Sequence, residues 1–439
     1  MKLCMIGTGY VGLVSGTCFS DLGNKVYCVD KNKEKINKLN QGISPIYEPG
    51  LDELIKKNHT AGRLFFTTDL KKAVKKSDII FICVGTPNKK GSQEVDLTYV
   101  FKAVKEIAKA TKNKKIIVTK STVPVNTGDK IDNILKKLRK KNFQVISNPE
   151  FLREGEAIRD FRYPDRIVIG SNNKKIFKIM KNLYQPLTNK GAKFFTTSRR
   201  GSELIKYASN AFLATKITFI NELSNLCEKS GINVEDISLG MGSDNRIGSR
   251  FLRAGPAYGG SCFPKDTKGL VSTANKFNID LSIVKSVIKS NAKRKILHTK
   301  NIHKIIGSKI KNKTIVFLGV TFKPNTDDMR DSPSLFMLPY LLKKGANIFY
   351  YDPTGKKNEF SKYKNCKYFK NIAEICKIAD LIILHTEWDE FKSLDFKKLI
   401  KKNNTAIYDL RNLYSYDYMK KNKIKYYSIG RPSTIQFRK

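Results

Sequence analysis

Two short motifs, far apart in the chain, carry residue types that can perform oxidation chemistry. Residues 7–12 read GTGYVG directly after an apolar run, and residues 259–266 read GGSCFPKD. Glycines in the first motif permit a tight turn and let the backbone approach a pyrophosphate. The second motif presents Cys262 as a thiol on a flexible loop beside charge. A dehydrogenase with a nucleophilic cysteine can hold an aldehyde covalently and oxidise it again, so the two motifs predict conversion of an alcohol to an acid.

The other parts of a dinucleotide site accompany the glycine motif. Asp30 ends the next expected strand, 18 positions after Gly12, where an acid would hold the ribose hydroxyls and favour NAD over NADP. Lys35 either neutralises charge near the adenosine or lies on a solvated surface. We therefore expect NAD as the cofactor. The motif itself supplies the expected contacts of Gly7, Gly9, Tyr10, Val11 and Gly12.

Polar residues follow three later strands, at the sheet edge where ligands of parallel sheets bind. Thr86 and Thr122 either line the nicotinamide pocket or cap helices. In the segment NPEFLREG, Glu150 and Glu154 flank Arg153. One of these carboxylates activates water, or the group forms an ion pair at the start of a surface helix.

Cys262 is the candidate nucleophile. The preceding glycines give access, Lys265 would favour the thiolate, and Asp266 is suitably placed to act as a base or to orient water. A single cysteine is more often a small buried hydrophobe, but its polar and glycine-rich neighbours argue against core packing.

A second constellation lies in the long apolar segment 201–229, which is expected to be helical. Glu203, Lys206 and Asn210 fall on one helical stripe by their spacing. Lys206 and Asn210 either donate hydrogen bonds to a developing oxyanion or bond a loop. The apolar residues on most faces of this segment predict a buried connector or a subunit interface.

Composition narrows the class of protein. The four histidines form no HExxH motif and the eight cysteines have no zinc spacing, so we expect no metal. The cysteines form no CxxC pair and several lie in apolar strands, which is typical of a reduced, cytoplasmic protein. An early first strand leaves no room for a signal peptide, and no apolar run is long enough for a membrane span.

The net charge of +44 admits a nucleic-acid-binding protein, but the lysines are spread over the whole chain rather than clustered. We therefore expect solvated basic faces that steer an anionic small substrate, and no nucleic acid. Arginine is scarce, so its positions are expected to hold phosphate or carboxylate groups. These positions are Arg153, Arg166, Arg246, Arg250, Arg253, Arg330 and Arg411.

Alternating apolar and amphipathic segments predict βαβ units and parallel sheets. The first series of expected strands is 2–6, 25–29, 78–83, 116–119, 144–147 and 167–169, and the second is 315–319, 348–351, 381–384 and 406–408. Helical segments follow the glycine-rich stretch 240–260 to about residue 310. The predicted fold is α/β, with two Rossmann-like doubly wound domains joined by a central helical region. The expected domains are 1–198 (NAD binding), 199–305 (helical, dimerising) and 306–439, a second α/β domain.

In combination, these motifs resemble the UDP-glucose/GDP-mannose dehydrogenase family over nearly the whole chain. Further matching blocks are 121–124, 164–170, 240–248, 319–333 and 409–411. The resemblance implies twofold, NAD-dependent oxidation of UDP-glucose to UDP-glucuronate through a thiohemiacetal and a thioester on Cys262. It implies that Lys206 and Asn210 stabilise the oxyanion and that Asp266 and Glu150 are the candidates for handling protons and water. Thr122 is a further implied catalytic residue.

The resemblance also implies that domain 306–439 binds the UDP-sugar, and it implies further binding residues and a homodimer or higher oligomer. Arg246 would reach the sugar of a neighbouring subunit, and Arg411 the carboxylate side of the sugar. Implied NAD contacts are Val11, Asp30, Lys35, Thr86, Thr122, Glu154, Lys265 and Arg330. Implied substrate contacts are Glu150, Phe151, Leu152, Arg153, Glu154, Lys206, Asn210, Phe251, Leu252, Arg253, Ala254, Gly255, Gly259 and Lys323.

Three positions depart from the family pattern: Gly85 stands where Pro is common, Pro256-Ala257 replaces an apolar-Gly pair, and Leu410 stands where Gly is common. They bring the geometry of three loops into question. The nearest alternative function is the same chemistry on GDP-mannose or a UDP-N-acetylhexosamine. A catalytically silent nucleotide-sugar binder is a further alternative, which the intact Cys262 argues against.

Overall fold

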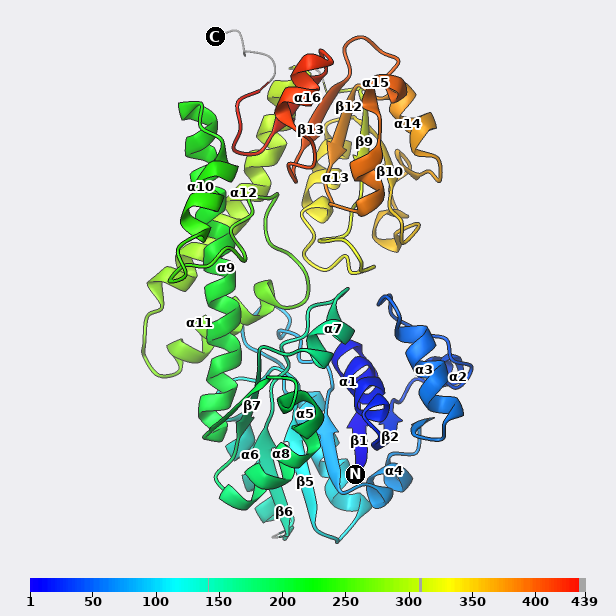
Figure 1. Cartoon of the computed structure of the whole chain (residues 1–439), viewed down its shortest axis with the longest axis vertical. Coiled ribbons are helices and arrows are strands. Elements are labelled where there is room, and N and C mark those ends of the chain that lie inside the picture. The colour runs from blue at the N-terminus through cyan, green and yellow to red at the C-terminus, as the bar shows by residue number, and fades with distance from the viewer. Residues whose placement is uncertain (141, 308–309, 434–439) are drawn as a thin grey trace. The chain divides into compact units, whose positions relative to one another are not determined.

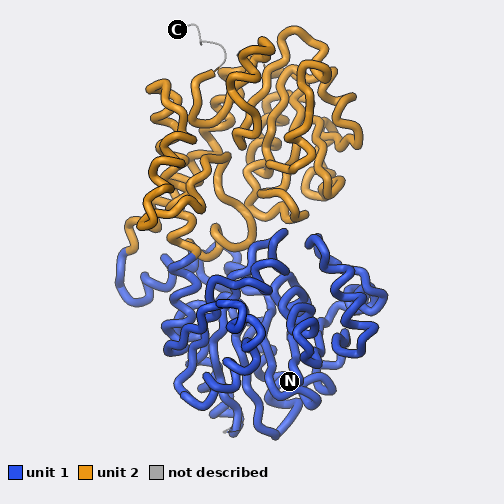
Figure 2. Tube along the Cα trace, in the orientation of Figure 1, with its two compact units in different colours: residues 1–209, 268–280 blue, residues 210–267, 281–439 orange. Residues whose placement is uncertain are grey.

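The computed structural model describes residues 1–140, 142–307 and 310–433 and separates into two compact units (Figure 2). Unit 1 comprises residues 1–209 and 268–280, and unit 2 comprises residues 210–267 and 281–439. Each unit contains one β-sheet with helices packed against it (Figure 1).

The sheet of unit 1 has eight strands in the order β3-β2-β1-β4-β5-β6-β7-β8. The order reverses between β1 and β4, which creates the switch point at which open α/β sheets bind ligands. Two edge strands, β3 and β8, were not expected from the sequence. The strands are β1 (Lys2–Ile6), β2 (Lys25–Val29), β3 (Leu64–Thr67), β4 (Ile79–Ile82), β5 (Lys115–Thr119), β6 (Phe143–Ser147), β7 (Arg166–Gly170) and β8 (Lys193–Thr197).

The expectation of an entirely parallel sheet is wrong for β7. This strand pairs antiparallel with β6 through Ser147 and Gly170, while β8 pairs parallel with β7. Helix α7 (Ala157–Arg162) is the only helix between β6 and β7 and has six residues. It is about 9 Å long, too short to return the chain along a strand of five residues. The chain therefore enters β7 from the end of the sheet at which β6 stops.

Helices cover both faces of this sheet, as the doubly wound prediction requires. One buried cluster contains apolar residues of α1, α2, α3, α7 and α8, and the other contains those of α4, α5 and α6. The additional bounds are α1 (Tyr10–Asp21), α2 (Lys33–Asn40), α3 (Leu51–Thr60), α4 (Leu70–Lys76), α5 (Thr98–Ala110), α6 (Thr127–Lys137) and α8 (Lys174–Thr188).

Unit 2 contains a six-stranded sheet in the order β11-β10-β9-β12-β13-β14, with every pair parallel. It confirms the second Rossmann-like domain, although β11 and β14 at its edges were not expected. The strands are β9 (Thr314–Leu318), β10 (Asn347–Tyr351), β11 (Cys366–Tyr368), β12 (Leu381–Leu384), β13 (Ala406–Asp409) and β14 (Lys425–Ser428). The helices are α13 (Ser334–Lys343), α14 (Ile372–Ile378), α15 (Phe396–Leu399) and α16 (Tyr416–Lys421), with short 3-10 turns at Asn358–Phe360 and Asp389–Ser393.

The central helices confirm the long helix that the sequence predicts. α9 (Arg199–Ser230) has 32 residues and is followed by α10 (Val234–Gly242), α11 (Phe263–Asn275) and α12 (Ser282–Ile306) (Figure 1). Residues 308–309, at the end of the helical region expected to reach about 310, lie outside the described residues. None of the helices within the described ranges is long and apolar enough to cross a membrane. The three-part division of the chain stays a prediction.

Candidate active site

The glycine motif forms the turn between β1 and α1. Gly7 has a φ of +98°, and a Cβ atom there would lie 2.8 Å from the carbonyl oxygen of Cys83. A Cβ atom on Gly12 would lie 1.9 Å from the carbonyl oxygen of Gly7, so both positions require glycine. By contrast, a Cβ atom on Gly9 would meet no atom of the described residues within 4 Å. The turn is therefore closely packed at Gly7 and Gly12 but open at Gly9, at the N-terminus of α1, where a pyrophosphate can bind.

Asp30 lies at the end of β2 and is bound to this turn. Its Oδ2 accepts hydrogen bonds from the backbone N–H (3.0 Å) and hydroxyl (2.8 Å) of Thr8. Lys35 Nζ lies 3.7 Å from the same oxygen. Burial raises the pKa of Asp30, but the hydrogen bonds from Asn32 and Thr8 outweigh it and bring this pKa below its usual value. The carboxylate is thus ionised at neutral pH and fixed beside the glycine turn.

The hydroxyl-bearing loops after β4 and β5 are tied to each other. Thr86 Oγ1 donates to the carbonyl of Thr122 at 2.9 Å, and Ser121 Oγ donates to the carbonyl of Val84 at 2.7 Å. Neither threonine is in the first turn of a helix, since α5 starts at Thr98 and α6 at Thr127. Capping therefore does not account for Thr86 or Thr122, and both lie at the carboxyl edge beside the switch point. Gly85 has open space around it, so its departure from Pro involves no close approach.

Glu150 is 8% exposed and each of its oxygens has fixed donors. Oε1 accepts from the backbone N–H groups of Phe151 (2.6 Å) and Leu152 (2.9 Å). Oε2 accepts from Ser15 Oγ at 3.2 Å and forms a buried ion pair with Lys120 Nζ at 2.9 Å. Burial lowers the pKa of Lys120, but Glu150 outweighs it and raises this pKa well above its usual value. Glu150 therefore anchors the turn that begins the segment 150–155.

Arg153 closes the same segment through an ion pair rather than through the carboxylates of Glu150 or Glu154. Its Nε and Nη2 bind Asp160 at 2.9 and 2.7 Å, and Nη2 also lies 2.5 Å from Glu156. The alternative of an ion pair at a helix start thus describes Arg153.

Sequence reasoning missed Glu48, whose buried carboxylate accepts from the backbone N–H groups of Gly155 (2.6 Å) and Ala157 (2.7 Å). The phenol of Tyr10 accepts from the N–H of Gly155 at 2.5 Å. Glu48 and Tyr10 therefore hold the end of the segment 150–155, and Tyr10 joins it to the glycine motif.

Lys206 lies in α9 with 5% of its surface exposed. Its Nζ is 5.0 Å from the ring centroid of Phe151, and the guanidinium carbon of Arg166 is 3.9 Å from the same centroid. Within the described part of the chain, the Lys206 ammonium has no hydrogen bond or ion pair. A nearly buried cation without an anionic partner is a strong candidate to bind an oxyanion of a ligand. Glu203, on the same stripe, instead accepts from the N–H of Gly128 at 2.7 Å.

Asn210 and Asp266 form a buried pair in unit 2. Asn210 Nδ2 donates to Asp266 Oδ2 at 2.6 Å, and both side chains are nearly inaccessible, at 6% and 1% exposed. The other carboxylate oxygen, Oδ1, lies 2.5 Å from Lys265 Nζ. Asn210 follows Lys206 by one turn of α9, so the expected Lys-Asn stripe exists and its asparagine is held by Asp266.

Cys262 immediately precedes α11, and its carbonyl accepts the first helical hydrogen bond, from Asp266 N at 2.8 Å. A thiol at a helix N-terminus is favoured in its thiolate form by the helix dipole. Lys265, expected to stabilise the thiolate, is paired with Asp266. The helix terminus is therefore an additional source of stabilisation that the sequence motif alone does not reveal.

The remaining seven cysteines are free thiols of a different kind. Six are buried, Cys366 is half-buried, and only Cys262 is exposed. Burial raises the pKa of each of the seven, to about 12 for Cys18, Cys83, Cys366 and Cys376. Among the eight thiols, Cys262 is therefore the one available to a dissolved electrophile.

The segment 251–255 contacts both Phe263, next to Cys262, and Arg411. Phe251, with a φ of +66°, packs edge-on against Phe263, the first residue of α11, at 6.1 Å between ring centroids. Arg253 Nη2 donates to the carbonyl of Arg411 at 2.8 Å. A Cβ atom on Gly255 would lie 3.3 Å from Arg411 Nη1. The structure thus brings these predicted substrate residues together within unit 2.

Two residues that sequence reasoning missed hold this segment in place. Asn221 Oδ1 accepts from the N–H of Gly255 at 2.8 Å, and Arg294 Nε donates to its carbonyl at 2.6 Å. Asn291 binds the backbone N–H and carbonyl of Tyr258 in the same way, at 2.9 and 3.0 Å. Ala257, between them, has a φ of +154°, a conformation that side-chain-bearing residues rarely adopt.

The loop after β9 packs against the loop that carries Cys262. A Cβ atom on Gly259 would lie 2.7 Å from the carbonyl oxygen of Asp331, and one on Gly260 would lie 2.7 Å from the ring of Phe322. Gly260 N–H donates to the carbonyl of Arg330 at 2.7 Å. Lys323 and Arg330 therefore lie on a loop in contact with the Cys262 loop, although the guanidinium of Arg330 itself binds Asp328 at 2.8 Å.

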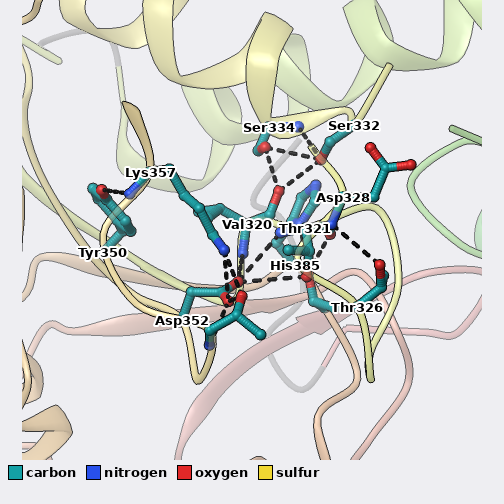
Figure 3. Close-up of polar contacts among 12 residues, drawn as sticks. Val320, Thr321, Thr326, Asp328, Ser332, Ser334, Tyr350, Asp352, Lys357 and His385 are labelled. Carbon is teal, nitrogen blue, oxygen red and sulfur yellow. Dashed lines mark hydrogen bonds and ion pairs between the residues drawn. The ribbon is translucent and has the colours of Figure 1, made fainter. Parts of the chain in front are cut away.

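The turn after β9, drawn in Figure 3, has an acid in the same position as Asp30 of the glycine turn, but this acid is buried. Asp352, at the end of β10, accepts from the N–H groups of Val320 (2.9 Å) and Thr321 (3.3 Å), much as Asp30 accepts from Thr8. Unlike Asp30, Asp352 is fully buried and lies 3.5 Å from the ammonium of Lys357. This acid is therefore part of the packed turn and not of a ligand surface.

Arg411 is held by Glu387 at 2.8 Å and donates to the carbonyls of His385 and Phe322, both at 2.8 Å. Leu410, which departs from the family's glycine, is fully buried in the core of the second sheet. Arg246 is exposed and binds Asp244 at 2.6 Å. The scarce arginines thus largely bind carboxylates and carbonyls of the chain itself.

No group of three His, Cys, Asp or Glu side chains that could hold a metal ion occurs in the residues that the structure describes. The loop that carries Cys262 contacts loops of unit 2, while the open glycine turn and Lys206 belong to unit 1. Short polar contacts position Asp30, Glu150 and Asp266, whereas the Lys206 ammonium has no hydrogen bond or ion pair among the described residues.

Models of one protein family match most of the chain. Residues 1–188, 200–293 and 316–416 match the NAD binding domain, the central domain and the UDP binding domain of the UDP-glucose/GDP-mannose dehydrogenase family. The chain is 48% identical over 436 residues to UDP-glucose 6-dehydrogenase of Rhizobium meliloti (strain 1021), covering 98% of this chain and 100% of that protein.

Solved structures extend the similarity to the fold. The UDP-glucose dehydrogenase of Pyrobaculum islandicum has a TM-score of 0.90 and 31% identity, covering 98% of this chain and 97% of that one. The UDP-D-ManNAc dehydrogenase of Pyrococcus horikoshii has a TM-score of 0.86 and 25% identity, covering 98% and 99%. The similarity therefore spans both sheets and the helices between them.

Proposed function

Because the chain belongs to the UDP-glucose/GDP-mannose dehydrogenase family, we propose that it oxidises UDP-glucose to UDP-glucuronate in two successive steps. NAD, when bound, accepts the hydride removed from C6 of the sugar in each step. Overall, one primary alcohol and one water yield a carboxylate, with two hydrides removed and three protons released. The near-complete coverage of UDP-glucose 6-dehydrogenase relatives supports the substrate.

Cys262 supplies the covalent step between the two oxidations. After the first hydride leaves C6, the thiolate attacks the aldehyde carbon and forms a thiohemiacetal. Loss of the second hydride gives a thioester. Water then attacks the thioester carbon, the C–S bond breaks, and the carboxylate and free thiol result. A covalent intermediate retains the aldehyde between the steps.

One observation carries this proposal: Cys262 is the exposed thiol among eight cysteines and lies at the N-terminus of α11. A structural cysteine would be shielded and have a raised pKa, as for the other seven, of which six are buried and Cys366 is half-buried. The position at the helix end favours the nucleophilic thiolate and leaves the sulfur accessible.

Lys206 and Asn210 are assigned to the oxygen on C6, where negative charge develops in the tetrahedral states. The ammonium of Lys206 supports this role because it is nearly buried and has no hydrogen-bond or ion-pair partner among the described residues. Asn210 is oriented by Asp266 at 2.6 Å, which fixes the amide before substrate binds. Donors that are already oriented stabilise an oxyanion without reorganisation.

Asp266 is assigned to proton transfer and to activation of the hydrolytic water, with Glu150 as the alternative. Glu150 has four fixed donors, including Lys120, and is better suited to hold the turn at Phe151 and Leu152. Thr122 is assigned to the nicotinamide side of the site.

NAD is assigned to the open glycine turn, with Asp30 on the ribose hydroxyls and Lys35 near the adenosine. Thr86, Glu154, Lys265 and Arg330 are further proposed contacts. The UDP-sugar is assigned to Phe151, Leu152, Arg153, the segment 251–255, Gly259, Lys323 and Arg411. The contacts among 251–255, Gly259 and Arg411 within unit 2 support their joint assignment.

We also assign a homodimer, with Arg246 reaching the sugar of a neighbouring subunit. Apolar side chains exposed along one side of α9 support it, because a subunit interface would cover them. They are Leu204 (44% exposed), Phe212 (66%), Phe219 (47%) and Leu226 (61%). Sedimentation analysis tests the assignment, and a monomer at enzyme concentrations used in turnover assays contradicts it. Cytoplasmic location stays a prediction.

The decisive experiment measures NADH formed per nucleotide sugar consumed, at limiting UDP-glucose and excess NAD. The wild type is expected to form about two NADH per sugar, and Cys262→Ser is expected to lose turnover of UDP-glucose to the acid. Cys227→Ser, a buried thiol, is the matched control. Absence of NADH formation with UDP-glucose contradicts the substrate, and GDP-mannose and UDP-N-acetylhexosamines are then the substrates to compare.

A further inference from the structure

We propose that the central helices of unit 2 form a second small-molecule site, which binds an anionic ligand bearing phosphate or carboxylate groups. The site is a cavity of about 480 Å³ between α9 and α12. This volume is typical of pockets for metabolites. Its lining contains none of the residues assigned to NAD or to the UDP-sugar.

The charges that line the cavity favour an anion. Arg294, Lys293 and Lys300 contribute three cationic side chains, against the single carboxylate of Glu222. That carboxylate already accepts a hydrogen bond from Ser290 Oγ at 2.5 Å. The lining therefore has an excess of positive charge, and its acid is engaged with a neutral donor.

Arg294 is the buried component of this charge, with 6% of its surface exposed. Its guanidinium donates to the carbonyls of Gly255 and Asn221, to Asn225 Oδ1 and to Ser224 Oγ, at 2.6 to 3.2 Å. It forms no ion pair with a carboxylate of the described residues. Burial lowers its pKa to about 10, so it remains a cation at neutral pH. A buried cation bound only by neutral groups gains from an anion beside it.

Asn221 supplies an independent indication of a ligand. It lines the cavity and is 2% exposed. Because its Oδ1 accepts from Gly255 N–H at 2.8 Å, the amide orientation is fixed and Nδ2 is the other atom. This buried Nδ2 has no hydrogen-bond partner in the described structure. Buried donors are normally satisfied, so an acceptor entering from the cavity would complete the site.

On α9 the cavity lies next to the exposed apolar stripe assigned to the dimer. At 3.6 residues per turn, Asn221 and Asn225 are roughly a third to a half of a turn from Phe212 and Phe219, whereas Glu222 lies on the stripe's side. A subunit packed on the stripe would therefore border the cavity at Glu222, across α9 from the wall that contains Asn221. The cavity's occupant would contact Asn221 and Arg294, the two side chains that hold Gly255 of the proposed substrate segment.

The test measures binding of pyrophosphate to the full-length protein by isothermal titration calorimetry at constant ionic strength. Lys293→Gln removes a cavity charge, and Asn221→Asp retains the acceptor for Gly255 while replacing the partnerless donor with an oxygen. Lys289→Gln, with the same charge change on α12 outside the cavity, is the matched control. Citrate in a parallel titration separates carboxylate from phosphate recognition.

Pyrophosphate or citrate is expected to bind wild type and Lys289→Gln equally, with Kd raised about tenfold by Lys293→Gln, the loss of one charge-assisted contact. Asn221→Asp is expected to raise it further. Absence of binding, or equal binding in all variants, overturns the proposal, since the anion then occupies another site. A change in oligomeric state on Lys293→Gln without anion binding also overturns it, in favour of a partner chain in the cavity. None of these readouts depends on turnover.

Discussion

Asn210 on α9 donates a 2.6 Å hydrogen bond to Asp266 on α11, and neither side chain is open to bulk water. The pair joins the helix that carries Lys206 to the helix that begins after Cys262. An amide oriented by a carboxylate is ready to donate its second N–H, and the carboxylate is held one helical turn from the thiol-bearing residue. The proposed chemistry at C6 depends on this pair.

Replacing Asp266 by Asn is therefore expected to lower kcat by about 100-fold or more, the usual contribution of a positioned acid or base. The amide retains the shape of the side chain but cannot accept a proton, so the thioester should persist on Cys262. Intact-protein mass spectrometry after brief exposure to UDP-glucose and NAD would detect the adduct. A variant whose kcat stays within threefold of wild type removes Asp266 from the mechanism.

Glu150→Gln is expected to act on stability more than on chemistry. Gln still accepts from the backbone of Phe151 and Leu152, but Lys120 loses its counter-charge while remaining buried. Breaking a buried pair from one side costs about 3–5 kcal/mol. Urea unfolding measures the loss, and Glu34→Gln, on the exposed surface of α2, is the control. Unchanged stability with a 100-fold lower kcat would instead assign the hydrolytic base to Glu150.

Iodoacetamide is expected to modify Cys262 before any other cysteine of the native protein. The other thiols are shielded and their pKa values are raised, whereas Cys262 is exposed. Peptide mapping should give at least about tenfold faster labelling at Cys262, because reactivity follows thiolate fraction and access. Cys366, which is half-buried, is the internal control. Comparable rates at Cys262 and Cys366 contradict a specialised thiol.

Glu203 is expected to make stability fall as pH rises. Burial raises its pKa in the folded state to about 7, above the usual 4.5. Between these values the unfolded chain loses the proton while the folded chain keeps it, so stability is greatest below pH 4.5 and declines up to pH 7. The full loss is about 3 kcal/mol.

Glu203→Gln retains the acceptor for Gly128 N–H and should be more stable than wild type at pH 8 by up to about that amount. The difference should nearly vanish at pH 5. Denaturant unfolding at both pH values measures it, again with Glu34→Gln as a control. A constant difference across the two pH values would show that Glu203 does not titrate in this range.

Ala257→Gly is expected to stabilise the protein by about 1 kcal/mol. Its φ of +154° is strained for alanine and costs the folded state about 1–3 kcal/mol. Glycine relieves this strain, but it also raises the conformational entropy of the unfolded chain, which offsets part of the gain. The midpoint temperature of thermal unfolding, Tm, should rise by about 2–4 °C. Ala254 is a buried neighbour without a positive φ, so Ala254→Gly should lower Tm. Destabilisation by both substitutions would contradict strain at Ala257.

The sequence predicted the central strands and the long helix well, because these carry continuous apolar runs or extended helical spacing. It missed β3, β8, β11 and β14, which are the edge strands of the two sheets. An edge strand is partly exposed and mixes polar with apolar residues, as in the sequence KFFTT of β8. The reversed direction of β7 also leaves no local pattern, since strand direction depends on the connection and not on strand composition.

The residues of the candidate site likewise fall into those that the local sequence predicts and those that it does not. Cys262, Asp30 and Lys206 were predicted because their residue types stand in unusual local surroundings. Glu48, Asn221 and Arg294 were missed because each acts through contacts with residues distant in the sequence, such as Arg294 with Gly255. Their types are ordinary for helix and loop surfaces. Only the folded chain shows that they are buried and bonded to backbone.

The boundaries between the two units have a practical meaning for dissecting the protein. Domains usually meet in exposed linkers, where a chain can be divided without breaking regular structure. Here two of the crossings, after Ser209 and after Thr267, fall inside α9 and α11. Truncation at either point would sever a hydrogen-bonded helix and expose its cut end. Neither half is therefore a natural fragment for independent expression, and domain swaps between relatives should exchange these two helices whole.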